Sequence, residues 1–568
     1  MPNWQPTVAL LSQSILLHDP DHLHFKTLQG RLSGVSTHGP RRGAESWTAP
    51  ARDETSGGSL RDRYTGAAML PDSAITDSAY QDALRWLYHL SPNLRTAAQI
   101  VADHPRKLGR MRALLDELGN PDAECASVLV AGTKGKGSIA AMAEAILRSA
   151  GVRAGLVTSP HLISWCERTR IDGVDITPAT VGRLMPSVRA AMDRLAQARP
   201  ALGQATTFEA GLALSLLAFA EAGVQVAIVE AGVGGLHDAT NVLDPLAVAL
   251  GPISYDHTAT LGPTLTSIAQ EKCGVFRRNR LAVVAAQPPE AQQVIEQAAA
   301  DTGTHLECVG TGTGADWRWQ PETAQACGGP FSVSGPRGHF AHLTLPLLGR
   351  HQRENATLAV ALATGVLEAL GQPQQPAEVG GSGPESRQHR AGQLEASAER
   401  RAGVAAEAVR AGLASVRWPG RLDVLRERPW LVVDGAHNGD SAARLAEALT
   451  ACFPVAARHL VFGTSVGKDV ARMLDALLPA TDRVTVTRSH HERSVPLDDL
   501  AMALGARGRT PASIPDVRDA VTDALQQAAP DDLIIVTGSL FVVGEALEAF
   551  GAGEPGSTRR ERAEQGGR

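Results

Sequence analysis

A glycine-rich segment with two lysines is the part of this 568-residue chain whose residues most clearly suit chemistry. Its sequence is Ala131-Gly132-Thr133-Lys134-Gly135-Lys136-Gly137-Ser138, and it lies between a short apolar run and an apolar pattern at helical spacing. Glycines let a backbone wrap a phosphate, the start of a helix offers free N–H groups, and lysine supplies positive charge. We therefore predict that this segment is a phosphate-binding loop.

The loop differs from a standard P-loop, because Gly137 separates Lys136 from Ser138 and Val130 stands where the first glycine is usual. Taken alone, the residues are also compatible with a glycine-rich turn between a strand and a helix whose lysines bind nothing. The predicted strand before the loop and the predicted helix after it favour phosphate binding.

Acidic, histidine, hydroxyl and glycine residues gather in further segments, most of which follow predicted strands. These segments are Thr158–Leu162, Glu230–Gly235 with Asp238–Asn241, Asp256-His257, and, on a predicted helix, Glu271–Gly274. In an open α/β sheet, ligands bind at the carboxyl ends of the strands. A hydroxyl, a carboxylate and an imidazole at that edge suit Mg²⁺ held between protein and phosphates.

Each of these segments also has an interpretation without function. Glu230 could cap a loop, and His257 alone is more often a structural histidine than a ligand. Glu271-Lys272 would usually be a solvated charge pair. Their joint order, in a chain that also carries the phosphate loop, is what favours a common site.

Strands and helices alternate around these segments, which predicts an α/β fold. We predict a doubly wound, mostly parallel sheet that carries the P-loop, plus a smaller C-terminal α/β domain that begins near Trp418. Strands are expected at 127–131, 155–157, 224–229, 247–250 and 281–285, and in the second domain at 430–433, 459–462, 484–487 and 533–536. The expected divisions are a disordered extension at 1–75, a first domain at 76–417 with an insertion at about 372–401, a second domain at 418–550, and a frayed tail at 551–568.

Bulk composition excludes several classes of function. The net charge is −6, the sequence pI is about 6.3 and aromatic residues make up 4%, so no nucleic acid partner is expected. The apolar run Ala210–Ala220 is too short to span a membrane, and Met1–Phe25 does not have the pattern of a signal peptide. The six scattered cysteines are expected to be reduced thiols in a cytoplasmic protein.

The ordered motifs resemble those of the folylpolyglutamate synthase/dihydrofolate synthase family, within the Mur ligase fold group. The resemblance extends from about Tyr80 to Ala549, apart from the insertion. The matching segments are Leu108-Gly109, Gly132–Ser138, Ser159–Leu162, Glu167-Arg168, Phe208-Glu209, Asp256-His257, Leu261-Gly262, Glu271–Gly274, His351-Gln352 with Asn355, Trp418–Arg421, Asp434–Asn438, Lys468-Asp469 and Thr537–Ser539.

The sequence departs from the family pattern at three positions. Lys134 replaces the usual Asn of the phosphate loop and places an extra positive charge beside the phosphates. The family usually has Gly-Gly-Arg-Leu-Asp-Ala-Thr-Asn, and here Leu236 replaces its Arg and His237 its Leu. These two residues adjoin the pterin-side pocket that the resemblance implies, so they bear on the choice of substrate.

The resemblance also implies roles for individual residues. For ATP these are Gly132, Thr133, Lys134, Gly135, Lys136, Gly137, Ser138, Asn355, Arg421 and Asp434; for the folate they are Thr207, Phe208, Asp238 and Ala239. Ser138, Ser159 and Glu230 would hold one Mg²⁺, and His257 would help to hold a second. The implied catalytic residues are Lys136, His257, Lys272, which resembles a lysine carboxylated by CO₂, and His437, a candidate contact for glutamate or phosphate.

The implied activity is that of an ATP-dependent ligase that adds L-glutamate to dihydropteroate, to the glutamate tail of a reduced folate, or to both, through an acyl phosphate. The enzyme is expected to be a monomer that uses ATP and two Mg²⁺ ions. Two alternatives stay open: a Mur-type ligase that adds an amino acid to a cell-wall precursor, and a nucleotide-binding regulator without ligase chemistry. The choice among folate substrates is also open.

Overall fold

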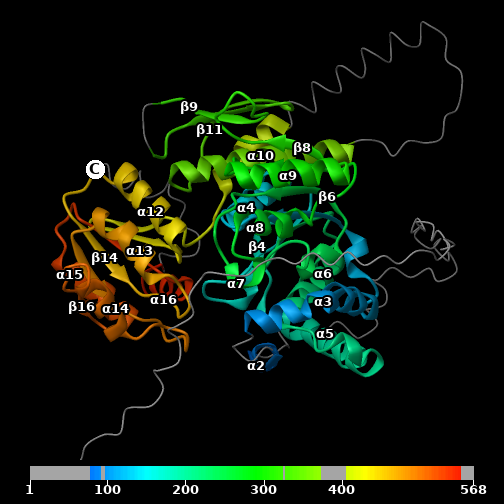
Figure 1. The fold of residues 1–568 in the computed structure, drawn as a ribbon, viewed down its shortest axis with the longest axis horizontal. Helices are drawn as coiled ribbons and strands as arrows, with labels where there is room; N and C mark the ends of the chain where they lie inside the picture. Colours follow the sequence, from blue (N-terminus) through cyan, green and yellow to red (C-terminus); the bar gives the residue numbers. More distant parts are fainter. Residues whose placement is uncertain (1–76, 91–95, 324–326, 372–404, 552–568) are drawn as a thin grey trace, which may run out of the picture. The chain divides into compact units, whose positions relative to one another are not determined.

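The computed structural model describes residues 77–90, 96–323, 327–371 and 405–551, and these form three β-sheets with their helices (Figure 1). The predicted extension at 1–75, the insertion at 372–401 and the tail from 552 onward lie outside the described residues.

The largest sheet has eight strands in the order β4-β3-β2-β5-β1-β6-β7-β8. Its parallel strands are β1 (Ala126–Ala131), β2 (Ala154–Val157), β5 (Val226–Glu230), β6 (Pro245–Leu250), β7 (Leu281–Val284) and β8 (His305–Cys308). Two short antiparallel strands, β3 (Thr169–Ile171) and β4 (Val174–Asp175), form one edge. The predicted doubly wound, mostly parallel sheet is therefore confirmed, with the strand that leads into the phosphate loop at its centre.

Alternate side chains of β1 point to opposite faces of the sheet and pack in two separate hydrophobic cores. Val128 and Val130 pack with α4 (Lys136–Ser149) and α10 (Arg350–Gly371) on one face. Leu129 and Ala131 pack on the other face, in the core formed by α2 (Asp77–Leu90), α3 (Ala97–Glu117), α5 (Pro178–Ala198), α6 (Thr207–Ala222), α8 (Leu265–Cys273) and α9 (Pro289–Thr302). A strand buried on both faces is apolar throughout, which explains its continuous apolar run.

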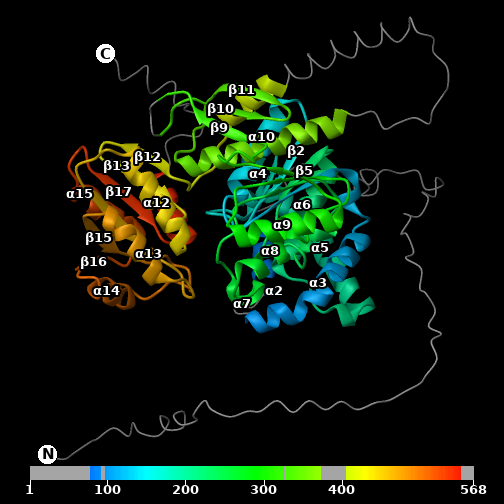
Figure 2. The ribbon, with the colours of Figure 1, turned by 45° about the horizontal axis from the view of Figure 1, so that its top comes forward.

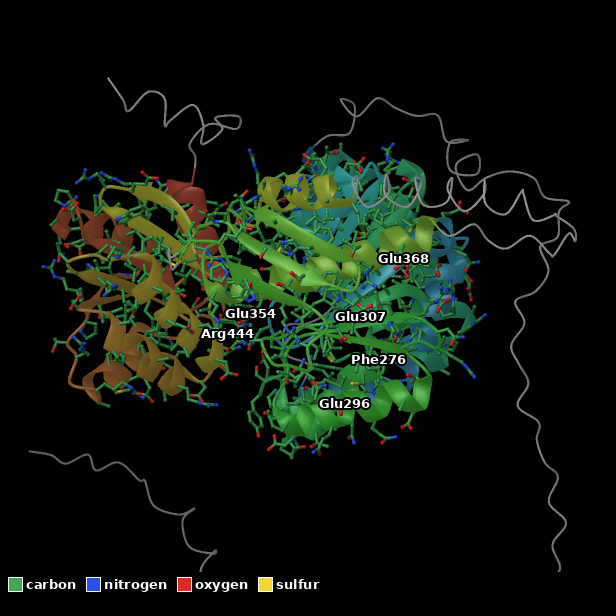
Figure 3. The ribbon with its side chains drawn as sticks, turned by 90° about the horizontal axis from the view of Figure 1, so that it is seen from above. Phe276, Glu296, Glu307, Glu354, Glu368 and Arg444 are labelled. Atoms are coloured by element: carbon green, nitrogen blue, oxygen red, sulfur yellow. A yellow bond between two sulfur atoms is a disulfide. The ribbon has the colours of Figure 1, made fainter. Side chains whose placement is uncertain are left out.

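A small antiparallel sheet of β9 (Arg318–Pro321), β10 (Phe331–Gly335) and β11 (Gly338–Leu343) adjoins the main sheet. Hydrogen bonds to the buried Glu307 of β8, which is labelled in Figure 3, attach it to the main sheet. The Glu307 carboxylate accepts hydrogen bonds from Trp317 Nε1 (2.7 Å) and from both terminal nitrogens of Arg337. A buried carboxylate is stable only with such donors, so this contact fixes the small sheet in place.

The C-terminal sheet has six strands in the order β12-β13-β17-β14-β15-β16 (Figure 2). They are β12 (Asp423–Glu427), β13 (Trp430–Asp434), β17 (Leu533–Thr537), β14 (Arg458–Phe462), β15 (Arg483–Val486) and β16 (Ala512–Ser513), and all pairs except β12–β13 are parallel. Helices α12 (Gly439–Cys452), α13 (Val470–Leu477) and α14 (Leu497–Gly505) cover one face, and α15 (Val517–Gln527) and α16 (Leu540–Phe550) the other. The predicted smaller α/β unit is thus present.

The expectation that all cysteines are reduced thiols is wrong for one pair. Cys327, just before β10, and Cys452, at the end of α12, form a disulfide with their Cα atoms 5.1 Å apart. They are 125 residues apart in the sequence, so their spacing gave no sign of the pairing. Over the parts of the chain that the structure describes, no helix has the length and apolar character needed to cross a membrane.

Candidate active site

The phosphate loop leaves the central strand β1 and is fixed against the segment that follows β6. The N–H of Thr133 donates to Pro252 O (3.0 Å), Thr133 Oγ1 donates to Ser254 O (3.2 Å), and Ser254 N–H donates back to Thr133 Oγ1 (3.2 Å). Gly135 has a left-handed φ of 79° directly before α4, a conformation that costs glycine little. The loop is therefore held in a defined shape at the N-terminus of a helix, where anions bind.

Lys134 forms an ion pair with Asp256, with 2.7 Å between Nζ and Oδ2, and both side chains are mostly buried. Burial would raise the pKa of Asp256, but the Lys134 ammonium holds it well below the usual range. The extra positive charge predicted beside the phosphates is thus paired with a carboxylate of the protein. This pair joins the phosphate loop to the segment that carries His257.

Lys136 and Glu230 face each other across the loop, with 4.0 Å between Nζ and Oε1. Glu230 ends β5 and is 7% exposed, and its Oε2 accepts a hydrogen bond from Ser159 N–H (3.1 Å). Burial raises the pKa of Glu230, and Lys136 opposes that shift. Ser138 lies buried in the first turn of α4.

The chemistry of the predicted metal ligands can be compared with the needs of Mg²⁺. Within the described residues, no three His, Cys, Asp or Glu side chains converge as a metal-binding cluster. Ser138, Ser159 and Glu230 offer hydroxyl and carboxylate oxygens, which Mg²⁺ prefers, and Mg²⁺ usually completes its shell with phosphate and water oxygens. These residues therefore fit a metal ion shared with a bound nucleotide.

His257 follows Asp256, the partner of Lys134, and half of its side chain is exposed. It has a left-handed backbone (φ 49°), and its N–H donates to Asp256 Oδ1 (3.0 Å). Burial lowers the pKa of the imidazole, with Asp256 acting in the opposite direction. A largely neutral imidazole can coordinate a metal ion.

Lys272 is 5% exposed, and its Nζ donates to the phosphate-loop carbonyl Gly132 O (2.8 Å). Burial, reinforced by Lys136, lowers the pKa of Lys272 to about 7. The neighbouring Glu271 bonds to His237 instead. Lys272 is therefore not the surface ion pair that its sequence alone would suggest.

The residues expected to contact the pteroate gather at the N-terminus of α6 and in the loop after β5. Thr207 Oγ1 donates to Leu87 O (2.8 Å), and Phe208 packs against this loop. Asp238 is fully buried: its Oδ1 accepts from Thr240 N–H (3.0 Å) and its Oδ2 from Val233 N–H (3.0 Å). The Asp238 carboxylate thus shapes the loop with its own hydrogen bonds, and the adjacent Ala239 is also fully buried.

The sequence interpretation missed Lys107 as a member of this group. Its Nζ lies 3.8 Å from Asp238 Oδ2 and 5.9 Å from the centroid of the Phe208 ring. The only signal was its place directly before the Leu108-Gly109 motif.

A buried ionic cluster fixes the start of α6. Arg110, 1% exposed, donates from Nε to Glu209 Oε1 (2.9 Å) and from Nη1 to Asp103 Oδ1 (2.8 Å). Glu209 also accepts from Thr206 N–H (2.8 Å), which caps the helix. The cluster links α3 to α6 and so determines where Phe208 stands.

The remaining predicted residues lie around the phosphate loop and at the end of β13. Asn355 of α10 packs on the loop, since a Cβ added at Gly135 would lie 2.5 Å from Asn355 Oδ1. Asp434 accepts hydrogen bonds from two backbone N–H groups; burial raises its pKa, and Arg421 opposes that shift. His437 Nδ1 donates to Gly435 O (2.8 Å), and burial lowers the pKa of His437 to about 4, so its Nε2 is free of a proton at neutral pH.

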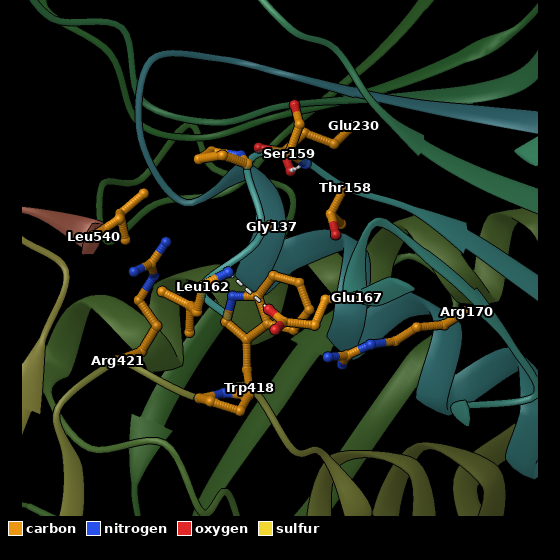
Figure 4. Close-up of a pocket in the computed structure, with 12 residues that line it drawn as sticks. Gly137, Thr158, Ser159, Leu162, Glu167, Arg170, Glu230, Trp418, Arg421 and Leu540 are labelled. Carbon is orange, nitrogen blue, oxygen red and sulfur yellow. Dashed lines mark hydrogen bonds between the residues drawn. The ribbon is translucent and has the colours of Figure 1, made fainter. Parts of the chain in front are cut away.

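A small cavity of about 50 Å³ brings several of these groups together (Figure 4). Its lining includes Gly137, Ser159, Glu230, Arg421 and Trp418. A Cβ added at Gly137 would lie 2.8 Å from the indole of Trp418, so the glycine that interrupts the usual P-loop pattern makes room for this ring. In the sequence, Trp418 is part of a motif but carries no sign of this contact.

Two family models match the chain. The Mur ligase middle domain matches residues 130–363, and the glutamate ligase domain of Mur ligases matches residues 420–540. A curated dihydrofolate synthase/folylpolyglutamate synthase from Mycobacterium tuberculosis is 34% identical over 475 residues, which are 78% of this chain and 90% of the relative.

Solved structures show the same relationship. A Mycobacterium tuberculosis folylpolyglutamate synthase complexed with ADP and AMPPCP has a TM-score of 0.69 at 30% identity, over 84% of this chain and 99% of that one. An Escherichia coli FolC in complex with DHPP and ADP has a TM-score of 0.66 at 27% identity, over 85% of this chain and 99% of that one. A bifunctional folylpolyglutamate synthase/dihydrofolate synthase with Mn, AMPPNP and L-glutamate bound has a TM-score of 0.64 at 28% identity, over 83% of this chain and 97% of that one.

Proposed function

Because this chain belongs to the folylpolyglutamate synthase/dihydrofolate synthase family, we propose that it joins L-glutamate to dihydropteroate, to the glutamate tail of reduced folates, or to both. It is an ATP-dependent ligase that forms an amide bond and releases ADP and phosphate. The observation that carries the assignment of the site is the buried Lys272 amine on the carbonyl of the phosphate loop, close to Lys136. A nucleotide-binding regulator has no need for such a group.

The first step activates the substrate carboxylate. Its oxygen attacks the γ-phosphorus of ATP, and the bond between that phosphorus and the β–γ bridging oxygen breaks. The products are ADP and an acyl phosphate. The N–H groups of Gly132–Ser138 and the ammonium of Lys136 are proposed to bind the β- and γ-phosphate oxygens and to offset the charge that develops there. Asn355, Arg421 and Asp434 are proposed to complete the ATP site.

The second step forms the amide. The glutamate amine attacks the acyl carbon, the tetrahedral intermediate expels phosphate, and the amine proton leaves to a base or to water. His437 is proposed to contact the incoming glutamate or the phosphate, and its unprotonated Nε2 can accept a hydrogen bond from the glutamate amine. Exclusion of water protects the acyl phosphate from hydrolysis.

Two Mg²⁺ ions are part of the proposal, and related structures carry Mn with a nucleotide analogue. Ser138, Ser159 and Glu230 would hold one ion, and His257 would help to hold the second. When bound, these ions would neutralise charge on the phosphoryl group being transferred.

Lys272 is proposed to carry a carboxyl group derived from CO₂. The neutral amine attacks the carbon of CO₂, one proton leaves, and the product is a carbamate anion. The low pKa of Lys272 keeps the reactive neutral amine available at neutral pH. An anion at this position would offset the positive charge of Lys136 and of bound metal ions.

Thr207, Phe208, Asp238 and Ala239 are proposed to form the pteroate side, with Asp238 acting through the loop that its carboxylate shapes. A relative bound to DHPP and another bound to L-glutamate support these two substrate classes. The cell-wall ligase alternative is not favoured, since this chain spans 90% of a folate-type relative. We propose a monomer, which light scattering would test.

An ADP-release assay with dihydropteroate or tetrahydrofolate, each with and without glutamate, tests the function. ADP release that requires both glutamate and a folate-type acid is the expected result. Release that needs only a cell-wall precursor, or that ignores glutamate, would overturn it. Comparing the rate with dihydropteroate and the rate with tetrahydrofolate shows whether the enzyme uses one of these acids or both.

A further inference from the structure

The backbone of the loop after β5 packs directly against the C-terminal end of α8. Leu236 N–H donates to Glu271 O (2.7 Å), and a Cβ added at Gly235 would lie 2.7 Å from the carbonyl oxygens of Glu271 and Lys272. Because no side chain fits between these backbones, a shift of the loop is transmitted to the segment that carries Lys272. The same loop continues into Asp238 on the pteroate side.

His237 makes two contacts with the Glu271 carboxylate, one from its backbone N–H and one from its imidazole, and together they clamp this loop to α8. Its N–H donates to Oε1 (2.9 Å) and its Nδ1 lies 2.9 Å from Oε2. The His237 side chain is 35% exposed and the Glu271 side chain 13%, so this pair is more shielded from solvent than a surface ion pair. On its other side the imidazole stacks on His104 of α3, with ring centroids 4.4 Å apart and planes 10° apart.

This arrangement decides where the Glu271 carboxylate points. Both of its oxygens are engaged by His237, although Lys272 is its neighbour in the sequence. The Lys272 amine donates instead to Gly132 O (2.8 Å) in the phosphate loop. A leucine at position 237, as the resemblance leads one to expect, has no side-chain donor with which to hold the carboxylate.

We propose that His237 is a positioning residue that locks the pteroate-side loop onto the helix of Lys272, and so aligns the substrate carboxylate with the phosphate loop. The proposal rests on the proposed function, because it assumes that the folate-type acid binds beside this loop. Without the imidazole, Glu271 Oε2 loses its partner, and only the backbone bonds from residues 236 and 237 still hold the loop to Glu271.

The test compares His237→Leu, Glu271→Met and the double variant in the full chain. Each single variant should raise the KM for tetrahydrofolate or dihydropteroate about tenfold, as expected for a lost charge-assisted hydrogen bond, and leave the KM for ATP within about twofold. Because both substitutions break the same contact, the double variant should be no worse than the worse single variant.

His490→Leu is the matched control. His490 makes the same pair of contacts, N–H to Glu545 Oε1 (2.7 Å) and Nδ1 to Glu545 Oε2 (3.1 Å), but outside the residues assigned to the site. Its KM values should equal those of the wild-type chain. An equal rise in the control, an unchanged folate KM in His237→Leu, or additive effects in the double variant would each overturn the proposal.

Hydrogen exchange separates this proposal from the proposed function. In the substrate-free protein, the amides of Leu236 and His237 should exchange faster in His237→Leu than in the wild-type chain, whatever the enzyme's substrate. Unchanged exchange would overturn the clamp. If the wild-type chain releases no ADP with folate and glutamate, the proposed function fails, while the exchange experiment still decides whether the clamp exists.

Discussion

Replacing Lys272 with Gln should abolish ligation, and the wild-type chain should lose activity reversibly when CO₂ is removed. Burial, reinforced by Lys136, lowers the pKa of Lys272 from 10.5 to about 7. At about pH 7.5, a lysine of pKa 10.5 is neutral in about 0.1% of molecules, and one of pKa about 7 in about 75%. Because CO₂ reacts only with the neutral amine, the site raises the reactive fraction by roughly 750-fold.

The assay follows ADP release in buffer depleted of CO₂, before and after bicarbonate is added. Activity should recover on addition, and at a fixed concentration of dissolved CO₂ the recovery should slow about tenfold for each pH unit below 7, because protonation removes the reactive amine. Carbon-13 bicarbonate should give a carbamate resonance that is absent from Lys272→Gln. An activity that ignores bicarbonate, with no carbamate resonance, would refute the reasoning.

The same pKa predicts an effect on stability in the absence of CO₂. Below about pH 7 both the folded and the unfolded chain carry the Lys272 proton, so the cost of burying the charge is fully present. As pH rises from about 7 toward 10.5, the folded state binds fewer protons than the unfolded state, and stability rises. Lys272→Met should therefore stabilise the fold by a few kcal/mol, up to about 5, at about pH 6.5 and by less at about pH 9, as measured by denaturant unfolding.

Lys136→Ala should lower ADP release by at least about 100-fold without changing the circular dichroism spectrum, because the γ-phosphate loses its cation; near-normal turnover at saturating ATP would contradict the loop assignment. Arg110→Met should reduce the free energy of unfolding by about 3–5 kcal/mol, since it removes the guanidinium that bonds to the buried carboxylates of Asp103 and Glu209; a loss below about 1 kcal/mol in denaturant titration would show that the cluster is not needed. Deleting residues 1–70, or 372–401, should leave both melting temperature and activity unchanged, because their composition buries little apolar surface; a loss of either would show that the deleted segment packs or acts.

The parallel core and the phosphate loop could be predicted because their signals are local. An apolar run followed by glycines and a helical pattern describes β1, its loop and α4 within about two dozen residues. The short edge strands β3 and β4 and the small sheet of β9–β11 were missed, since strands of two to six residues have few positions at which alternation can show.

Contacts between distant segments could not be predicted from residue types. Arg110 and Glu209 are 99 residues apart, and nothing in their local sequence marks them as partners. The same holds for Lys134, whose ammonium was expected beside the phosphates and is paired with Asp256, 122 residues away. His237 was recognised as a departure, but its bond to Glu271 became visible only when the fold brought the two segments together.

The disulfide between Cys327 and Cys452 turns 125 residues of sequence separation into a closed covalent ring. The ring contains all of α10 and the segment 372–404, and it joins the chain before β10 to the end of α12. A peptide bond cut anywhere inside it would leave the two fragments covalently attached. Such a nicked chain would run as one species on a non-reducing gel and as two after reduction, so a scission in this segment would stay hidden until a reductant is added.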